Sequence, residues 1–91
     1  MTRDEIEASL HHIFREKFEI ENPGIDEDLR EIYEFDSIDA IELLQEIEIL
    51  LNSELTRPEK KKAMEIRTLR QIVQYIQDLS RTRTLQNPSS I

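Results

Sequence analysis

The sequence predicts an all-α protein, a small four-helix bundle with three longer helices and a short third helix. Three observations favour this fold class. The chain of 91 residues has one glycine and three prolines, and good helix formers dominate the rest. Capping boxes, in which a threonine precedes Glu or Gln by three residues, mark three candidate helix starts. Apolar residues recur at helical spacing along the longer segments. At this length there is room for one core in a single domain.

The first helix is expected over residues 2–18, where Thr2 and Glu5 have the spacing of a capping box. Charged residues fill its outer face. Its apolar stripe consists of Ile6, Leu10, Ile13, Phe14 and Phe18.

A long, partly apolar connection over residues 25–35 follows the turn at Asn22-Pro23-Gly24. Its apolar side chains are expected to pin it to the core, and a short helical turn over 28–33 is compatible with the sequence. Because so long a connection is uncommon between helices, we expect the flanking helices to run roughly parallel, with the loop crossing back between them.

The second long helix is expected over residues 37–51, preceded by two good N-cap residues, Asp36 and Ser37. The predicted buried stripe of this helix is Ile38, Ile41, Leu44, Ile47 or Ile49, and Leu51. Leu43 falls at the boundary of this stripe beside a row of acids. It is either an ordinary boundary residue or a contact for a partner protein.

A short third helix is expected over residues 57–64, beginning at a second capping box formed by Thr56 and Glu59. Proline at position 58 suits the first turn of this helix, where its missing N–H costs least. The run Lys60-Lys61-Lys62 is interpreted as its solvated face.

The last helix begins at the third capping box, formed by Thr68 and Gln71. Its apolar stripe consists of Leu69, Ile72, Val73, Ile76 and Leu79. The pattern stops after Ser80. We therefore expect a helical domain over residues 1–80 and a disordered C-terminal tail over 81–91.

The formal net charge of −8 is unevenly distributed along the chain. Residues 1–54 hold 17 acids and 4 bases, whereas residues 55–91 hold 3 acids and 8 bases. An acidic surface of this density repels nucleic acid and attracts basic protein surfaces. The alternative is a solvated surface that only keeps the protein soluble.

Composition also limits the cellular compartment in which the protein is expected. The absence of cysteine excludes disulfides and thiolate metal sites. The charged N-terminus has no apolar signal region, and no apolar stretch approaches the length of a membrane span. We expect a soluble, cytoplasmic monomer that does not insert into membranes or bind nucleic acid.

No constellation for catalysis is present, so the chain is not expected to be an enzyme. Ser37 lacks a candidate general base, because His11 and His12 lie on another predicted helix. These adjacent histidines point about 100° apart on a helix and cannot chelate one metal ion. The hydroxyl of Ser37 is then either an acceptor for a group added by another enzyme, near the positive end of a helix dipole, or only a helix cap.

The stretch Asp36-Ser37-Ile38 and the helix behind it resemble the signature of the acyl carrier protein family. The resemblance covers about residues 2–79. It includes the first amphipathic helix, the long apolar-studded loop, the short third helix and the helix that opens at Thr68. The residues after the serine that carry it are Asp39, Ile41, Glu42 and Leu43.

The resemblance implies that Ser37 is the attachment site for 4′-phosphopantetheine, transferred from coenzyme A by a phosphopantetheinyl transferase. The thiol of this arm would carry acyl groups as thioesters between enzymes of fatty acid, specialised lipid or polyketide synthesis. The apolar interior between the second long helix and the short third helix would shelter the acyl chain. The residues expected to meet basic patches on the transferase and on acyl-transferring or condensing enzymes are Asp36, Asp39, Glu42, Leu43, Glu46 and Glu48.

The chain departs from the family pattern at several places, of which two concern the approach to Ser37 and the short third helix. The glycine that often precedes the signature is missing, and the bulky Tyr33-Glu34-Phe35 stands before Asp36. The short third helix carries Lys60-Lys61-Lys62, although this helix is commonly acidic in the family. These differences favour a specialised carrier with dedicated enzymes. The alternatives are a peptidyl or D-alanyl carrier protein, and a non-carrier acidic helical adaptor in which Ser37 is only a cap.

Overall fold

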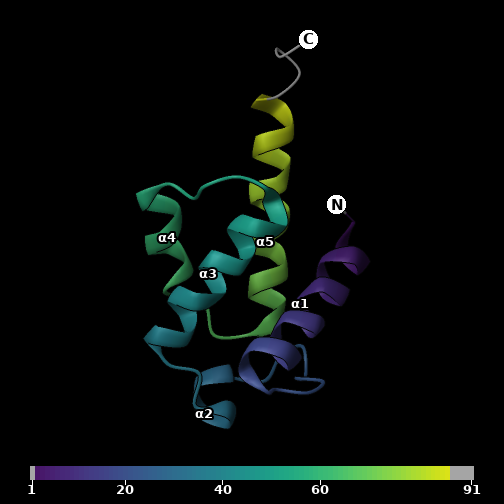
Figure 1. Cartoon of the computed structure of the whole chain (residues 1–91), viewed down its shortest axis with the longest axis vertical. Coiled ribbons are helices and arrows are strands. Elements are labelled where there is room, and N and C mark those ends of the chain that lie inside the picture. Colours follow the sequence, from purple (N-terminus) through teal and green to yellow (C-terminus); the bar gives the residue numbers. More distant parts are fainter. Residues whose placement is uncertain (1, 87–91) are drawn as a thin grey trace.

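The fold is all-α, in agreement with the sequence prediction, and has five helices within the residues that the structure describes. The computed structural model describes residues 2–86, with side chains to residue 83. The helix that raises the count from the predicted four to five is the short helical turn in the long connection. The helices are α1 (Arg3–Phe18), α2 (Leu29–Tyr33), α3 (Ser37–Leu51), α4 (Arg57–Ala63) and α5 (Leu69–Gln86) (Figure 1).

All three predicted capping boxes are present. At the start of α1, the Glu5 amide donates to Oγ1 of Thr2 over 3.2 Å, and the Thr2 amide donates to Oε1 of Glu5 over 2.9 Å. The same reciprocal pair forms between Thr56 and Glu59 before α4, and between Thr68 and Gln71 before α5. Each box satisfies amides that a helix N-terminus would otherwise leave unpaired.

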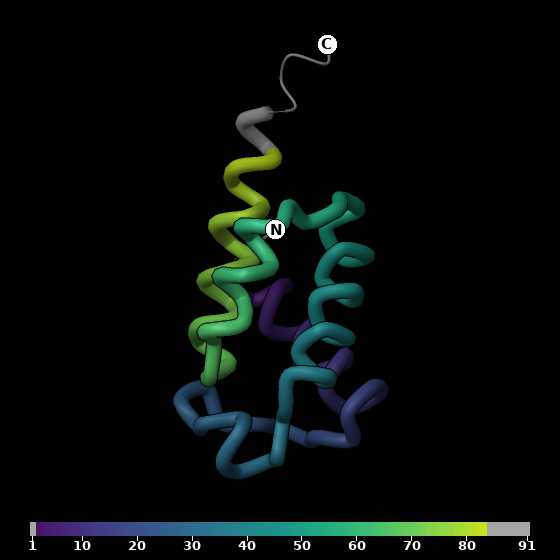
Figure 2. Tube along the Cα trace, turned by 90° about the vertical axis from the view of Figure 1, so that its left-hand side faces the viewer, coloured from purple at the N-terminus to yellow at the C-terminus, as the bar shows by residue number. Residues whose placement is uncertain are grey.

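α1 runs in the direction opposite to α3 and α5, which corrects the expected parallel arrangement. In Figures 1 and 2, α1 descends from the N-terminus, and both α3 and α5 ascend from the lower end of the bundle. The connection between α1 and α3 therefore does not cross back along the bundle. It passes beneath it and covers the lower end of the core.

The connection is held in this position by buried side chains and by backbone hydrogen bonds to the start of α5. Ile20, Leu29 and Phe35 are buried. The amide of Leu29 donates to the carbonyl of Arg67 over 2.8 Å, and the amide of Arg70 donates to the carbonyl of Ile25 over 3.0 Å. The prediction that this loop is pinned to the core is confirmed.

The core lies between α1 and α5, with α3 and the covering loop against it. The predicted apolar stripes of α1 and α5 are buried, apart from Phe18, which is only half-buried. The fully buried members on these two helices are Ile6, Leu10, Phe14, Leu69, Ile72, Val73 and Ile76.

The predicted buried stripe of α3 is confirmed in part, since Leu44 and Ile47 are buried and Leu51 is half-buried. Leu43, Leu44 and Ile47 are buried, whereas Ile38 and Ile49 are 73% and 72% exposed. At 100° per residue, one side of α3 carries only apolar residues, including Leu43, and the predicted stripe was displaced from it because isoleucines also stand among the acids on the other side. Packing against α1 and α4 selects the face that carries Leu43.

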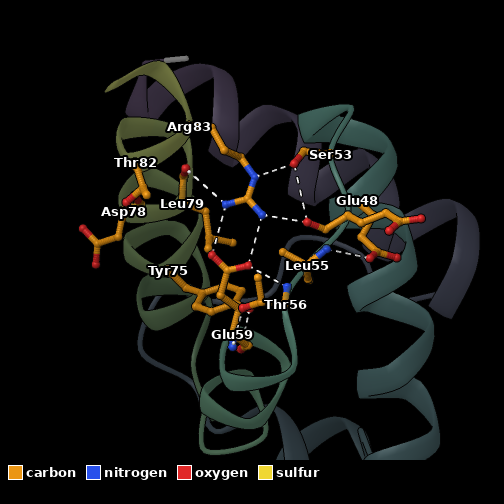
Figure 3. Close-up of polar contacts among 11 residues, drawn as sticks. Glu48, Ser53, Leu55, Thr56, Glu59, Tyr75, Asp78, Leu79, Thr82 and Arg83 are labelled. Carbon is orange, nitrogen blue, oxygen red and sulfur yellow. Dashed lines mark hydrogen bonds and ion pairs between the residues drawn. The ribbon is translucent and has the colours of Figure 1, made fainter. Parts of the chain in front are cut away.

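α5 continues to Gln86, so residues 81–86 are not the disordered tail that the sequence predicted. The apolar pattern ends at Leu79 because the following turn faces polar groups rather than the core. Arg83 donates from this turn to Ser53 and Glu59, as Figure 3 shows. The rest of the predicted tail, residues 87–91, lies outside the described part of the chain. Within the described part, no helix is both long and apolar enough to cross a membrane.

Candidate functional site

The N-terminus of α3 is capped by Asp36 and not by Ser37. Oδ1 of Asp36 accepts a hydrogen bond from the Asp39 amide over 3.0 Å, and Oδ2 of Asp39 accepts one from the Asp36 amide over 3.2 Å. This is a capping box with two aspartates, and Ser37 is the first residue with helical geometry. The side chain of Ser37 is therefore not needed to begin the helix.

The hydroxyl of Ser37 is exposed and makes no hydrogen bond to any described residue. It stands on the first turn of α3, where the backbone amides of residues 37 and 38 have no intrahelical acceptor. Free amides and the positive end of the helix dipole favour an anionic group at this position. The site thus offers an accessible alcohol beside groups that stabilise a phosphate ester.

Phe35 fixes the backbone immediately before this helix start. It is buried, and its ring centroid lies 5.6 Å from that of Phe14 and 5.2 Å from that of Phe18. The bulky segment that the sequence placed before Ser37 is thus anchored in the core. It leaves Asp36 and Ser37 exposed just beyond the anchor.

A hydrogen bond between Tyr33 and Glu27 stabilises the segment before Ser37 from within the connection. The Tyr33 hydroxyl donates to Oε1 of Glu27 over 2.6 Å, and the Gly24 amide donates to the same oxygen over 2.6 Å. The hydrogen bond from Tyr33, followed by that from Gly24, holds the pKa of Glu27 below its usual value. The same bond raises the pKa of Tyr33.

The acids predicted to bind partners do not form one uniform row. Asp36 and Glu42 are exposed, and Asp39 is half-buried within the capping box. Glu46 is half-buried, with Oε2 4.0 Å from Nζ of Lys17. Glu48 faces the loop before α4, where its Oε2 accepts from the Leu55 amide over 2.8 Å.

Leu43 lies in the core and not at the boundary that the sequence indicated. Its side chain is 5% exposed, because α3 turns this face toward the interior of the bundle. The exposed apolar residues beside the acids are instead Ile38 and Ile41, which the sequence placed in the core. Both lie on the side of α3 that also carries its acids, opposite the wholly apolar side.

The interior between α3 and α4 is closed. The cavity there has about 20 Å³ of free space and is walled mainly by apolar side chains such as Leu29, Leu43, Ile47 and Ile66. A single water needs about 10–15 Å³ by the same measure, so the cavity would hold little more than one. A bound acyl chain would require these helices to separate.

A larger, open groove lies on the outside of the same two helices. It has a volume of about 520 Å³, and its wall on α3 begins at Ile41, one turn after Ser37. Arg57, Lys60 and Lys61 line its wall on α4.

Fold and site together define a small helical bundle that presents the exposed, unbonded hydroxyl of Ser37 at a helix start. No group of three or more His, Asp or Glu side chains among the described residues could hold a metal ion. The model of the phosphopantetheine attachment site family matches residues 8–76, about three quarters of the chain. The chain belongs to this family. No curated protein and no solved structure matches it significantly.

Membership confirms the resemblance to acyl carrier proteins and the predicted cofactor. The domain of this family is the attachment site for a covalently bound 4′-phosphopantetheine group, whose thiol forms thioesters. The matched segment includes Ser37 and the whole of α3 and α4. It ends at residue 76, so the last turns of α5, with Arg83, lie beyond it.

Proposed function

We propose that the protein carries acyl groups as thioesters on a 4′-phosphopantetheine arm attached to Oγ of Ser37. The observation that supports this site most directly is the exposed Ser37 hydroxyl on the first turn of α3, with Asp36 supplying the cap. The adaptor alternative requires Ser37 to be the cap, and that position is taken.

The other serines in the matched segment are poorer candidates for the attachment of phosphopantetheine. Ser9 is half-buried in the middle of α1. Ser53 is half-buried, and its Oγ accepts from Nε of Arg83 over 2.7 Å. Ser37 therefore combines exposure, a free hydroxyl and a helix N-terminus in one residue.

Attachment would require a partner enzyme, because no described side chain accepts a hydrogen bond from the Ser37 hydroxyl to act as its base. A phosphopantetheinyl transferase would take the hydroxyl proton while Oγ attacks the β-phosphate of coenzyme A. The new phosphate ester forms as the pyrophosphate bond breaks, and adenosine 3′,5′-bisphosphate leaves. Within this chain, Asp36 holds the helix start and the first-turn amides stabilise the phosphate.

The proposed docking surface for the transferase and for acyl-transferring or condensing enzymes consists of acids around exposed isoleucines. Basic patches on these enzymes would meet the acids, which lie beside Ile38 and Ile41 on α3. Leu43 is left out because it is buried. The acids proposed for this surface are Asp36, Asp39, Glu42 and Glu46, with Glu48 at its edge.

We further propose that the protein acts as a cytoplasmic monomer and is not itself a catalyst. The acidic α3 favours acyl cargo in fatty acid, specialised lipid or polyketide synthesis. A peptidyl or D-alanyl cargo would use the same arm on Ser37. The intact mass of protein purified from its own host separates these alternatives, because it reports the arm and the cargo together.

Incubation with coenzyme A, magnesium and a phosphopantetheinyl transferase tests the site. We expect the intact mass to increase by one phosphopantetheine, Ser37→Ala to abolish the increase, and the matched variant Ser9→Ala to retain it. An unchanged mass of the wild-type protein with several competent transferases would overturn the proposal. So would normal loading of Ser37→Ala.

A further inference from the structure

The open groove between α3 and α4 combines an apolar floor with an uncompensated basic wall. Ile41, Leu44 and Met64 supply the apolar part, and Arg57, Lys60 and Lys61 supply the basic part. None of these three bases pairs with an acid among the described residues. Such a surface is suited to a ligand with an apolar body and an anionic end.

The acids near the groove do not cancel this charge. Among the described residues, Glu48 is the one carboxylate that lines it, against three bases. Glu59, the acid on α4 itself, binds the guanidinium of Arg83 on the side facing α5 (Figure 3). The wall on α4 therefore has positive charge in a protein whose net charge is −8.

The groove is also placed to receive whatever the arm carries. Ile41 lies one turn after Ser37, about 6 Å along the helix axis, and Leu44 lies about 10 Å along it. A group tethered at Ser37 has a high effective concentration beside the groove, so contacts that would be weak between free molecules become significant. Exposed lysine–carboxylate pairs are weak contacts of this kind.

We propose that the cargo of this carrier is an acyl group with an anionic terminus, and that Lys60 and Lys61 bind that terminus. The apolar part of the acyl chain lies over Ile41 and Met64. This inference rests on the proposed carrier function and specifies its substrate class. It also gives a role to the lysine run that departs from the family pattern.

Two cargoes that differ only at the tip test the proposal. The protein is loaded at Ser37 by a transferase with adipoyl-coenzyme A or hexanoyl-coenzyme A, which have acyl chains of equal carbon number. The amide signals of Ile41 and Met64 are then compared with those of the unacylated holo-protein. We expect the adipoyl group to shift both signals and the hexanoyl group to leave them nearly unchanged.

The basic wall is tested by a matched pair of variants. In Lys60→Gln/Lys61→Gln, we expect the adipoyl-dependent shifts to fall about threefold or more, because two favourable charge contacts are lost. Lys62→Gln/Arg81→Gln removes the same charge outside the groove and should keep the shifts. Lys62 lines a separate hollow beside Gln74 and Asp78, and Arg81 is exposed on α5.

Two results would overturn the inference. Equal shifts with both cargoes would show that the groove binds the arm or the apolar chain without regard to the tip. Adipoyl-dependent shifts that persist in Lys60→Gln/Lys61→Gln would show that these lysines do not bind the anionic terminus. Failure of the carrier function itself is separate, since it appears earlier as an unchanged mass at the loading step.

Discussion

Asp36 and Ser37 are adjacent oxygen-bearing side chains, and the backbone gives them different roles. The extended conformation of Asp36 lets its carboxylate reach back over the first turn to the Asp39 amide. Ser37 already has helical geometry, and its hydroxyl accepts no hydrogen bond from the first-turn amides. Because Asp36 supplies the cap, the proposed modification of Ser37 would not remove a hydrogen bond from the helix start.

Substitution of each residue by alanine should separate these roles. We expect Asp36→Ala to lower the free energy of unfolding by about 1 kcal/mol, because the amide of Asp39 loses its acceptor. Ser37→Ala should change it by less than about 0.5 kcal/mol. Urea unfolding of the unmodified proteins measures both values. A larger loss for Ser37→Ala than for Asp36→Ala would contradict the assignment of the cap.

At the scale of elements, the C-terminal part of α5 positions α4. None of the residues of α4 is buried, and only Ala63 among them packs against the core. Arg83 donates to both carboxylate oxygens of Glu59 over 3.0 and 3.1 Å, and its Nη2 donates to the carbonyl of Glu54 over 2.8 Å (Figure 3). The Tyr75 hydroxyl adds a bond to the Glu59 carbonyl over 2.7 Å.

Removal of the guanidinium should therefore destabilise the protein. We expect Arg83→Ala to lower the free energy of unfolding by about 2 kcal/mol, because several charge-assisted hydrogen bonds in a half-buried site are lost together. Arg81→Ala, on the exposed side of the same turn, is the control and should be nearly neutral. Equal stability of the two variants in urea unfolding would show that α4 does not depend on this contact.

The same contact should make stability depend on pH. The hydrogen bond from Arg83 is the main cause that holds the pKa of Glu59 below its usual value. A lowered folded-state pKa stabilises the fold above the unfolded-state value and loses this effect as pH falls through the folded-state value. The stability difference between wild type and Arg83→Ala should thus be largest near neutral pH and shrink below about pH 4. A difference that does not change with pH in urea unfolding would contradict this linkage.

Tyr75 completes this group of contacts on the inner side of α4. Burial raises the pKa of Tyr75 to about 12, with a smaller contribution from the charge of Glu59. Its hydroxyl therefore stays protonated and continues to donate to the Glu59 carbonyl well above neutral pH. The contact of α4 with α5 is consequently more sensitive to acid than to moderate alkali.

At the scale of the whole molecule, charge is separated between neighbouring helices. α3 presents acids beside exposed isoleucines, and α4 presents bases across the open groove. In the proposed docking, electrostatic attraction by the acids on α3 would speed the encounter with a basic partner and would weaken as salt is added. We propose that the bases on α4 bind a different, anionic ligand.

Reversal of one exposed acid tests the docking surface. We expect Glu42→Lys to lower kcat/KM for loading by the transferase about fivefold at low salt, because attraction becomes repulsion near Ser37. Glu21→Lys changes the charge equally on the exposed loop after α1 and should have a smaller effect. The difference should decrease as salt is added. Rates that are independent of salt would contradict electrostatic docking.

The sequence by itself determined the features that depend on a few neighbouring residues. The three capping boxes join residues three positions apart, so Thr2, Thr56 and Thr68 could be recognised directly. The helix start at Asp36-Ser37 and the family signature could also be recognised, because both depend on residues that are adjacent in the sequence. The apolar stripes of α1 and α5 were readable because each has a polar opposite face.

Tertiary structure alone decided the features that depend on distant partners. The inner face of α3 was predicted wrongly in part, because isoleucines also stand on its acidic side, and packing against α1 and α4 buries Leu43 and leaves Ile38 exposed. The last turns of α5 lack an apolar stripe, and Arg83 finds its acceptor on Glu59, 24 positions earlier in the chain. A contact between residues so far apart leaves no local periodic signal, because it depends on how α4 and α5 meet in space.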